Sequence, residues 1–593
     1  MAPMARSGAG RLRGWRRLGV ALATLATLAA LVACTSPPPV VAPGTAAVPA
    51  APTPARELVV GVDDLSGGFN PHTLADLNPI PNAVAGLLLP SAFRQAADSS
   101  WQIDYTMLES VRVTGSDPFT VTYRIRHDAA WSDGAPIAAE DFAYLAEQMP
   151  ARPGVVSGAG YRLIDEVVSA DGGKTVRVVF RDQYPGWRTL FRELLPAHLL
   201  KDAPGGWTDA LDDGIPVSGG PFVLTPVDPT RRELVLARND RYWDTPAWAD
   251  RLVLRQLTDG ELADALATGS VQAILSGRPD QVSLALLAEA GVRDPLVVPQ
   301  PSVVHVVLRS GSTAISDPRV RAAVAAALDR ADLIAVGAAG GPSAGLAADA
   351  QVLAPSQAGY APTRPADTPA APDPAAVARL LTEAGYTRTP EGWSRDGDLL
   401  ELVVAAPEGS DPYSLLAARV ADQLAAVGIG ASVRTPPADQ LYDPLGSDDA
   451  VPDPADGAVE PAPQAGGTGG AGEETPVDIA VVPQPAGGDP ATLLASNHGC
   501  PLDGPDSEPA AVAIAGACES SLQPAIEGAL TGRVPVGSTI AGIEPVLWQR
   551  AVAIPLYQQA SVFVVVAGLE GVSPGPLMEG PLDGAQRWWR VAR

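Results

Sequence analysis

Strand-like and helix-like segments alternate along most of this chain, and this alternation restricts the fold more than any other feature. Short runs rich in Val, Ile and Leu with turn residues at their ends are typical of strands. Longer runs with apolar residues three and four apart are typical of helices. The predicted strands are 58–62, 119–126, 176–180, 399–405 and 431–434, and the predicted helices are 82–93, 138–148, 317–334, 374–385 and 413–427. This order predicts α/β lobes whose sheets are largely covered by helices.

The length of 593 residues exceeds what one hydrophobic core supports, so two or three packed domains are expected. Residues 443–476 interrupt the alternation, because they consist mostly of Gly, Pro, Ala and acidic residues. No Lys or Arg occurs between Arg434 and Arg533. We predict that 443–476 is a disordered acidic insertion between two ordinary strands.

The N-terminus predicts export and lipid attachment. Residues 1–19 carry five arginines and no acid, and residues 20–32 form an apolar run of 13 residues. A helix needs about 20 residues to span a bilayer, so this run suits a signal peptide instead. Residues 31–34 (LVAC) resemble the lipobox of bacterial lipoproteins. The expected arrangement is a signal peptide over 1–33, lipid on Cys34, and a proline-rich tether over 34–56 that holds the protein on the extracytoplasmic face of the cell membrane.

Acidic residues outnumber basic ones by 67 to 41, which gives a formal net charge of −26. An acidic surface repels phosphate backbones and anionic headgroups. The charge therefore argues against nucleic acid as a partner and against electrostatic docking on a membrane. Its simplest role is to keep an exported protein soluble.

Two cysteines remain besides Cys34. In the oxidising environment of an exported protein, Cys500 and Cys518 are expected to form a disulfide. The closed loop of 19 residues would stabilise the fold by about 3 kcal/mol in the chain-entropy treatment. A metal site is the alternative, although His498 is the only histidine nearby.

Patterns that could signal catalysis or cofactor binding lack their required surroundings. Residues 467–472 (GTGGAG) fit a dinucleotide-binding pattern, but they lie in the low-complexity insertion rather than between a strand and a helix. Residues 341–345 (GPSAG) fit the nucleophile-elbow pattern around Ser343, without a buried strand before the serine. The five histidines are scattered without metal-ligand spacing. We expect a protein that is not an enzyme and has no metal or cofactor.

Several segments, taken in order, resemble one known family. They are 131–142 (WSDGAPIAAEDF), 216–222 (PVSGGPF), 238–243 (RNDRYW), 317–333 (DPRVRAAVAAALDRADL) and 554–557 (IPLY). Together they resemble family 5 of the extracellular solute-binding proteins, which serves peptide and nickel ABC importers. The resemblance implies a monomer with an α/β, two-lobed periplasmic-binding-protein-like fold (class II, cluster C) and an extra domain. A ligand held as the lobes close and a cognate ABC permease are implied as partners.

The same resemblance implies domain boundaries. The first lobe is expected to consist of residues 57–95, 216–300 and 561–593. The extra domain is expected over 96–215, and the second lobe, with its insertion at 443–476, over 301–560.

Residues 67–94 (GGFNPHTLADLNPIPNAVAGLLLPSAFR) also resemble a narrower group, the LpqW-type lipoproteins of actinobacteria. These share the fold but are associated with phosphatidylinositol mannoside and lipoarabinomannan synthesis rather than with proven peptide import. Two functions therefore stay open. The first is capture of a peptide-like or other small solute for import by an ABC transporter. The second is binding of an envelope glycolipid precursor to regulate lipoglycan synthesis.

Ligand-facing positions follow from the family resemblance alone. The implied residues are Ser66, Phe69 and Asn70 in the first lobe and Gln484, Ala486 and Asp489 in the second. Peptide-binding members carry an aspartate that pairs with the peptide ammonium, and this chain has Ala486 at that place when aligned on Pro490. Because a buried ammonium without a partner is unfavourable, the resemblance does not support peptide binding in the usual mode.

Overall fold

A mixed sheet of ten strands runs through the protein in a computed structural model that describes residues 56–442, 477–500 and 519–590, except 229, 367, 369 and 370. In spatial order the strands are β17 (Gly430–Arg434), β16 (Glu401–Ala405), β18 (Ile479–Pro485), β12 (Leu296–Leu308), β19 (Ala553–Val565), β11 (Ala273–Ser276), β1 (Glu57–Val62), β10 (Arg251–Gln256), β9 (Glu233–Arg238) and β8 (Phe222–Leu224). The predicted acidic insertion at 443–476 lies outside the described residues.

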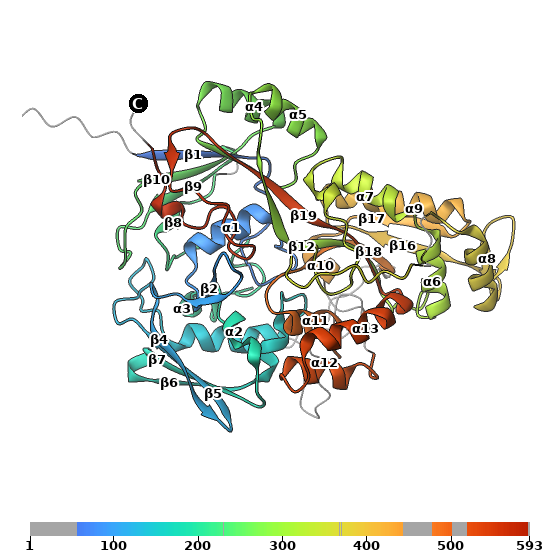
Figure 1. The fold of residues 1–593 in the computed structure, drawn as a ribbon, viewed down its shortest axis with the longest axis horizontal. Helices are drawn as coiled ribbons and strands as arrows, with labels where there is room; N and C mark the ends of the chain where they lie inside the picture. Colours follow the sequence, from blue (N-terminus) through green and yellow to red (C-terminus); the bar gives the residue numbers. More distant parts are fainter. Residues whose placement is uncertain are drawn as a thin grey trace, which may run out of the picture. The chain divides into compact units, whose positions relative to one another are not determined.

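Strands β12 and β19 join the two lobes. Each has 13 residues, about twice the usual strand length, and the two pair antiparallel on both sides of an irregular stretch. One end of the pair lies beside β11 in the first lobe, and the other end lies beside β18 in the second. Figure 1 shows both strands passing from one lobe to the other. The fold is therefore a two-lobed α/β structure, as the sequence resemblance implies.

The first lobe has helices on both faces of its part of the sheet. Helices α4 (Asp259–Thr268) and α5 (Gln281–Glu289) share one apolar cluster with β1, β10 and β11. Helix α1 (Pro79–Leu88) lies against the opposite face, in the largest core cluster. The predicted helix at 82–93 is shifted from this position. The observed helix α1 begins earlier because Asn78 caps it by accepting from the Ile80 N–H at 3.3 Å. It ends before Pro90, whose ring disfavours a helical conformation in the preceding residue.

A close backbone approach fixes α1 in place. A Cβ atom on Gly220 would lie 2.0 Å from the carbonyl oxygen of Leu87, so only glycine fits there. Asn239 holds the same turn by donating from its side chain to the Gly220 carbonyl at 2.9 Å. The glycine-rich and asparagine-containing segments found in the sequence thus position the helix that forms one wall of the cavity described below.

The second lobe packs four helices, α6 (Pro318–Ala327), α7 (Arg330–Ala338), α8 (Pro374–Glu383) and α9 (Tyr413–Ala426), around the second core cluster. The prediction of one helix over 317–334 is wrong. The chain turns at Leu328, and Asp329 starts α7 by accepting from the Asp332 N–H at 3.0 Å. An aspartate that caps a new helix ends the previous one.

A separate sheet of four strands forms the predicted extra-domain region. Its order is β4 (Leu108–Ser116), β5 (Phe119–Ile125), β7 (Thr175–Phe180) and β6 (Ile164–Ala170), with α2 (Ala139–Ala151) and α3 (Ala197–Leu200) beside it. Trp131 is fully buried and donates to Asp141 at 3.4 Å, while Asp141 also accepts from the backbone N–H groups of Ala138 and Ala197. The segment at 131–142, which resembles the family signature, therefore supplies buried hydrogen bonds that hold this region together.

The remaining elements complete the two lobes. They are α10 (Ala438–Tyr442), α11 (Pro490–His498), α12 (Gln523–Leu530), α13 (Val536–Arg550), β2 (Phe93–Gln95), β3 (Trp101–Ile103), β13 (Thr387–Arg388), β14 (Trp393–Arg395), β15 (Asp398–Leu399), β20 (Leu569–Glu570) and β21 (Trp589–Arg590). Within the described part of the chain, every helix is too short or too polar to cross a membrane.

Candidate ligand-binding site

The pairing of β12 with β19 is interrupted where the strands pass between the lobes. Regular pairing stops at Pro299 opposite Ala560 and resumes at Val303 opposite Gln558. Side-chain amides replace the missing backbone bonds. Gln300 donates to the Ser561 hydroxyl at 2.7 Å, and Gln558 donates to the Gln300 carbonyl at 2.8 Å. The break lies at the predicted lobe boundaries, 300/301 and 560/561.

A cavity of about 190 Å³ lies against this break. This is far more than the roughly 10–15 Å³ that a single water requires. Its walls come from α1 and residues 71–79, from 156–161 and 189–193 in the predicted extra domain, from 298–302 on β12, from 485–489 on the second lobe, and from 577–581 near the C-terminus. Segments far apart in the sequence, together with single residues such as Trp101 and Leu275, thus converge on one space, and both lobes contribute.

The lobes are in contact on one side of the cavity. Arg162 donates to the carbonyl of Ala495 on α11 at 3.2 Å, and the N–H of Ala159 donates to the hydroxyl of Ser496 at 3.1 Å. The hydroxyls of Tyr184 and Thr492 lie 2.7 Å apart. Helix α11 belongs to the predicted second lobe and its partners to the extra-domain region, so the arrangement is a closed one.

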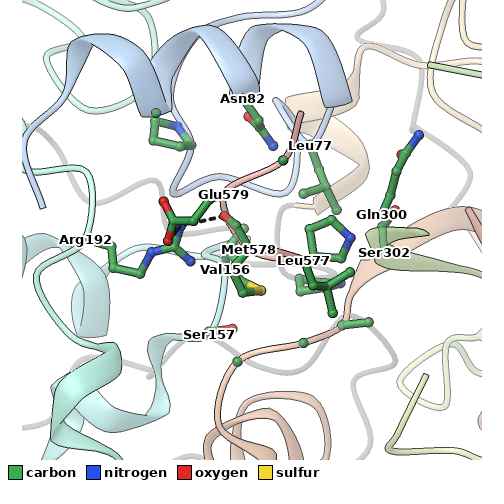
Figure 2. A pocket seen from close by; sticks show the side chains of 18 of the residues that line it. Leu77, Asn82, Val156, Ser157, Arg192, Gln300, Ser302, Leu577, Met578 and Glu579 are labelled. Carbon is green, nitrogen blue, oxygen red and sulfur yellow. Dashed lines mark hydrogen bonds and ion pairs between the residues drawn. The ribbon is translucent and has the colours of Figure 1, made fainter. Parts of the chain in front are cut away.

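Much of the cavity wall is apolar, and Figure 2 shows Leu77, Val156, Leu577 and Met578 around it. Asn82 points from α1 into the same space. Its Oδ1 is buried, and among the described residues it has no hydrogen-bond partner. Mostly apolar pockets with a few placed polar groups are typical of small-molecule sites.

One end of the cavity carries charge. Arg192 donates to the Met578 carbonyl at 2.8 Å and to Glu193 at 3.2 Å, and it lies 3.7 Å from Glu579. Its guanidinium also lies over the Trp101 ring, 5.3 Å from the centroid. Burial raises the pKa of Glu193 against the opposing effect of Arg192. The arginine is therefore held by protein groups on several sides.

Two of the six sequence-predicted ligand-facing residues lie in the cavity wall. These are Ala486 and Asp489, at the end of β18 and the start of α11. Asp489 caps α11 by accepting from the N–H and hydroxyl of Thr492 at 2.9 and 2.7 Å. Gln484, two residues before Ala486, is buried outside the wall.

The other three predicted residues lie beside the wall rather than in it. Asn70 is fully buried and donates to the Trp207 carbonyl at 2.8 Å, so its side chain holds a loop together. Phe69 packs in the core. Ser66 is exposed, and its hydroxyl donates a hydrogen bond to the Asp64 carboxylate at 2.7 Å. The next two residues of this loop, Pro71 and His72, do line the cavity.

Sequence reasoning missed Asn82, Arg192 and Glu193. Asn82 is a lone polar residue in an apolar helical run, and Arg192 and Glu193 form a charged pair inside the run LFRELL (190–195). A polar residue that interrupts an apolar segment can signal a side chain in a binding site. That these three side chains meet at one cavity cannot be predicted from the sequence, because Glu193 has φ +47°, a left-handed backbone that turns the chain locally.

The remaining sequence hypotheses concern catalysis, metals and the disulfide. Ser343 accepts from the backbone N–H of Ala560 at 3.0 Å, so its hydroxyl holds the hinge strand. Within the described ranges, no group of three or more His, Cys, Asp or Glu side chains could hold a metal. Cys500 is disulfide-bonded, while Cys518 and Cys34 lie outside the described residues, as does the glycine pattern at 467–472.

His72, in the cavity wall, makes acid stability testable. Burial lowers its pKa to about 4 from 6.5, so the unfolded chain binds a proton between these values that the folded protein does not. Stability is fully present above about pH 6.5 and is lost as the pH falls toward 4. Between pH 7 and pH 5 the unfolding free energy of wild type should fall by about 2 kcal/mol more than that of His72→Gln. Urea unfolding at both pH values measures this.

The exposed His127 supplies the control for that comparison. His127→Gln should follow wild type at both pH values. Burial also lowers the pKa of His305 and His498 to about 4, and burial raises the pKa of Asp141 to about 6, which acts in the opposite direction. These groups are present in all three proteins and cancel in the comparison. Equal losses in wild type and His72→Gln would refute the assignment.

Comparison with known proteins gives consistent similarities. The model for bacterial extracellular solute-binding proteins, family 5 (middle), matches residues 96–451. The probable monoacyl phosphatidylinositol tetramannoside-binding protein LpqW of Mycobacterium tuberculosis is 35% identical over 98% of this chain and 99% of its own. The oligopeptide-binding protein OppA of the same species is 28% identical over 58% of each chain.

Solved structures show the same fold. The oligopeptide-binding protein AppA of Bacillus subtilis, in complex with a nonapeptide, superposes with a TM-score of 0.69 at 15% identity, covering 91% of this chain and all of that one. NikZ of Campylobacter jejuni, in complex with Ni(L-His), gives a TM-score of 0.64 at 16% identity over the same shares. At these identities the likeness concerns the fold alone.

Proposed function

Since the chain belongs to the bacterial extracellular solute-binding proteins of family 5, we propose that it is a lipid-anchored receptor that encloses a small solute between its lobes and delivers it to an ABC permease. The membrane anchor would be lipid on Cys34, followed by the proline-rich tether at 34–56. The members of this family are binding proteins rather than enzymes.

The cavity at the break between β12 and β19 carries this proposal. It is walled by both lobes, and the two strands that cross there are the connection about which the lobes would open. A ligand that contacts both walls binds the closed arrangement better than the open one, and it shifts the population accordingly. The permease would then meet the closed arrangement of the receptor mainly when a solute is bound.

A second candidate function is binding of an envelope glycolipid precursor that regulates lipoglycan synthesis. It is favoured by the LpqW similarity, which spans nearly the whole of both chains, while the similarity to OppA spans 58%. Ala486 supports it too, because that residue cannot pair with a peptide ammonium in the usual mode. LpqW is named as a probable binder of a monoacyl phosphatidylinositol tetramannoside.

Binding and gene deletion together separate these candidates. The full chain in mild detergent is titrated with a soluble tripeptide pool and with phosphatidylinositol mannoside, and its melting temperature is followed. A shift with the peptides, together with lost solute uptake in a strain lacking the gene, supports import. A shift with the glycolipid and altered lipoarabinomannan supports the second candidate. Neither shift in a folded protein would contradict both.

The Cys34→Ala variant tests the anchor. Position 34 would then offer no thiol for lipid attachment, so the protein should leave the membrane fraction or remain unprocessed at its N-terminus. Fractionation and the mass of the isolated protein measure this outcome, with Cys500→Ser as the control that retains Cys34. A Cys34→Ala protein that stays in the membrane fraction at its mature mass would exclude the lipoprotein assignment.

A further inference from the structure

The charged side chains around the cavity differ in how free they are to meet a ligand. Besides His72, four acidic or basic residues line it: Arg192, Glu193, Glu579 and Asp489. One cation against three carboxylates leaves the wall with a formal excess of two negative charges. His72 adds no positive charge at neutral pH, because burial lowers its pKa to about 4.

Arg192, the sole cation in this described wall, already forms ion pairs with two carboxylates. Its polar contacts with described residues all use Nη2, which donates to the Met578 carbonyl and to Glu193 and lies 3.7 Å from Glu579. The guanidinium faces the Trp101 ring, its Nε is buried without a hydrogen-bond partner among the described residues, and only 12% of the side chain is exposed. Figure 2 shows it directed at the 577–579 segment beside Glu579. Because Glu193 and Glu579 already balance its charge, an anionic ligand group that approached Arg192 would also approach these two carboxylates.

Glu193 differs from the other two carboxylates. Asp489 caps α11, and Glu579 accepts from the Gln95 N–H at 2.8 Å and from Arg94 at 3.2 Å. The hydrogen bonds of the described residues use only Oε1 of Glu193, through Arg192. Glu193 thus has an oxygen available to accept a hydrogen bond in the cavity wall, with 17% of its side chain exposed.

We infer that the cavity admits only ligand groups without negative charge, and that Glu193 determines this specificity by accepting a hydrogen bond from a hydroxyl or amine of the ligand. The inference rests on the proposed ligand site and narrows it. If the glycolipid is the ligand, its sugar hydroxyls would enter the cavity and its phosphate would stay outside. Anionic chelates and phosphates would be rejected, because burying them against net negative charge, beside a cation that two carboxylates already balance, is unfavourable.

The test uses two matched pairs of small probes on the full chain in mild detergent. Trialanine amide carries a cation and N-acetyltrialanine an anion, while α-mannobiose is neutral and mannose 6-phosphate is anionic. By calorimetric titration, at least one of the cationic and neutral probes should bind, and its anionic counterpart should bind roughly tenfold or more weakly. Tighter binding of either anionic probe overturns the inference. If none of the four probes binds, the proposal of a small-solute site, on which this inference rests, is contradicted.

Variants assign the discrimination to Glu193. Glu193→Gln keeps the shape and removes the charge, so it should reduce the preference for the uncharged or cationic probe by roughly fivefold or more. Asp489→Asn, which preserves a good helix cap, is a second charge removal in the same wall and guards against misfolding of the first variant. The exposed Glu166→Gln serves as control and should retain the preference. An unchanged preference in a folded Glu193→Gln protein contradicts its role.

Discussion

Asn82→Trp is expected to lower ligand affinity by roughly 100-fold or more, while the protein stays folded. The side chain points from α1 into the cavity, so an indole there would fill space that the ligand needs. Little is lost in the protein itself, because the buried Oδ1 has no hydrogen-bond partner among the described residues. A loss of this size corresponds to about 2.7 kcal/mol of binding free energy. Calorimetric titration with whichever ligand binds wild type measures it.

Gln102→Trp provides the matched control for this variant. Gln102 is exposed on β3, beside Trp101, which lines the cavity, and among the described residues its side chain hydrogen-bonds only to Ser100. The same bulk added there should leave affinity within about twofold of wild type. Wild-type affinity in a folded Asn82→Trp protein would place the ligand somewhere other than this cavity.

Glu544→Ala is expected to lower the free energy of unfolding by about 4 kcal/mol. The carboxylate is 1% exposed and accepts from the N–H groups of Gln351 and Val352 at 2.9–3.0 Å and from the Thr363 hydroxyl at 2.6 Å. Removing it leaves buried donors unsatisfied, and each costs about 1–3 kcal/mol. Urea unfolding measures the change.

The segment that Glu544 holds also lies along the hinge strand. The Ala348 N–H donates to the Leu556 carbonyl at 3.0 Å, and the Gln558 N–H donates to the Leu346 carbonyl at 2.8 Å. Loss of the Glu544 carboxylate should therefore loosen the segment beside β19 as well as lower the free energy of unfolding. The exposed Glu391→Ala supplies the control and should change stability by less than about 0.5 kcal/mol. Comparable destabilisation by the two changes would refute this role of Glu544.

Periodicity predicted the elements better than it predicted their ends. Confirmed strands include 58–62, which is β1, and 399–405, whose observed counterpart β16 begins at Glu401. Apolar alternation survives folding because it records which side chains are buried. The break between α6 and α7 was missed because it depends on one aspartate, which reads equally well as an exposed helical residue until its capping bond is seen.

The cavity was harder to predict than the fold. The family resemblance led to Asn70, whose side chain holds its own loop together, whereas His72 in the same loop lines the cavity. Arg192 and Glu193 are more than 100 residues away from this loop in sequence. They reach the cavity through a left-handed turn and ion pairs that no local pattern records.

Native mass spectrometry of the full chain, after incubation with an extract of its own cell envelope, tests most directly whether the cavity between the lobes holds a ligand. Wild type is predicted to carry one noncovalent ligand per chain, and Asn82→Trp is predicted to carry none under the same conditions. Gln102→Trp should match wild type. A wild-type protein that binds nothing from the extract, or a ligand retained equally by Asn82→Trp, would contradict a binding site in this cavity.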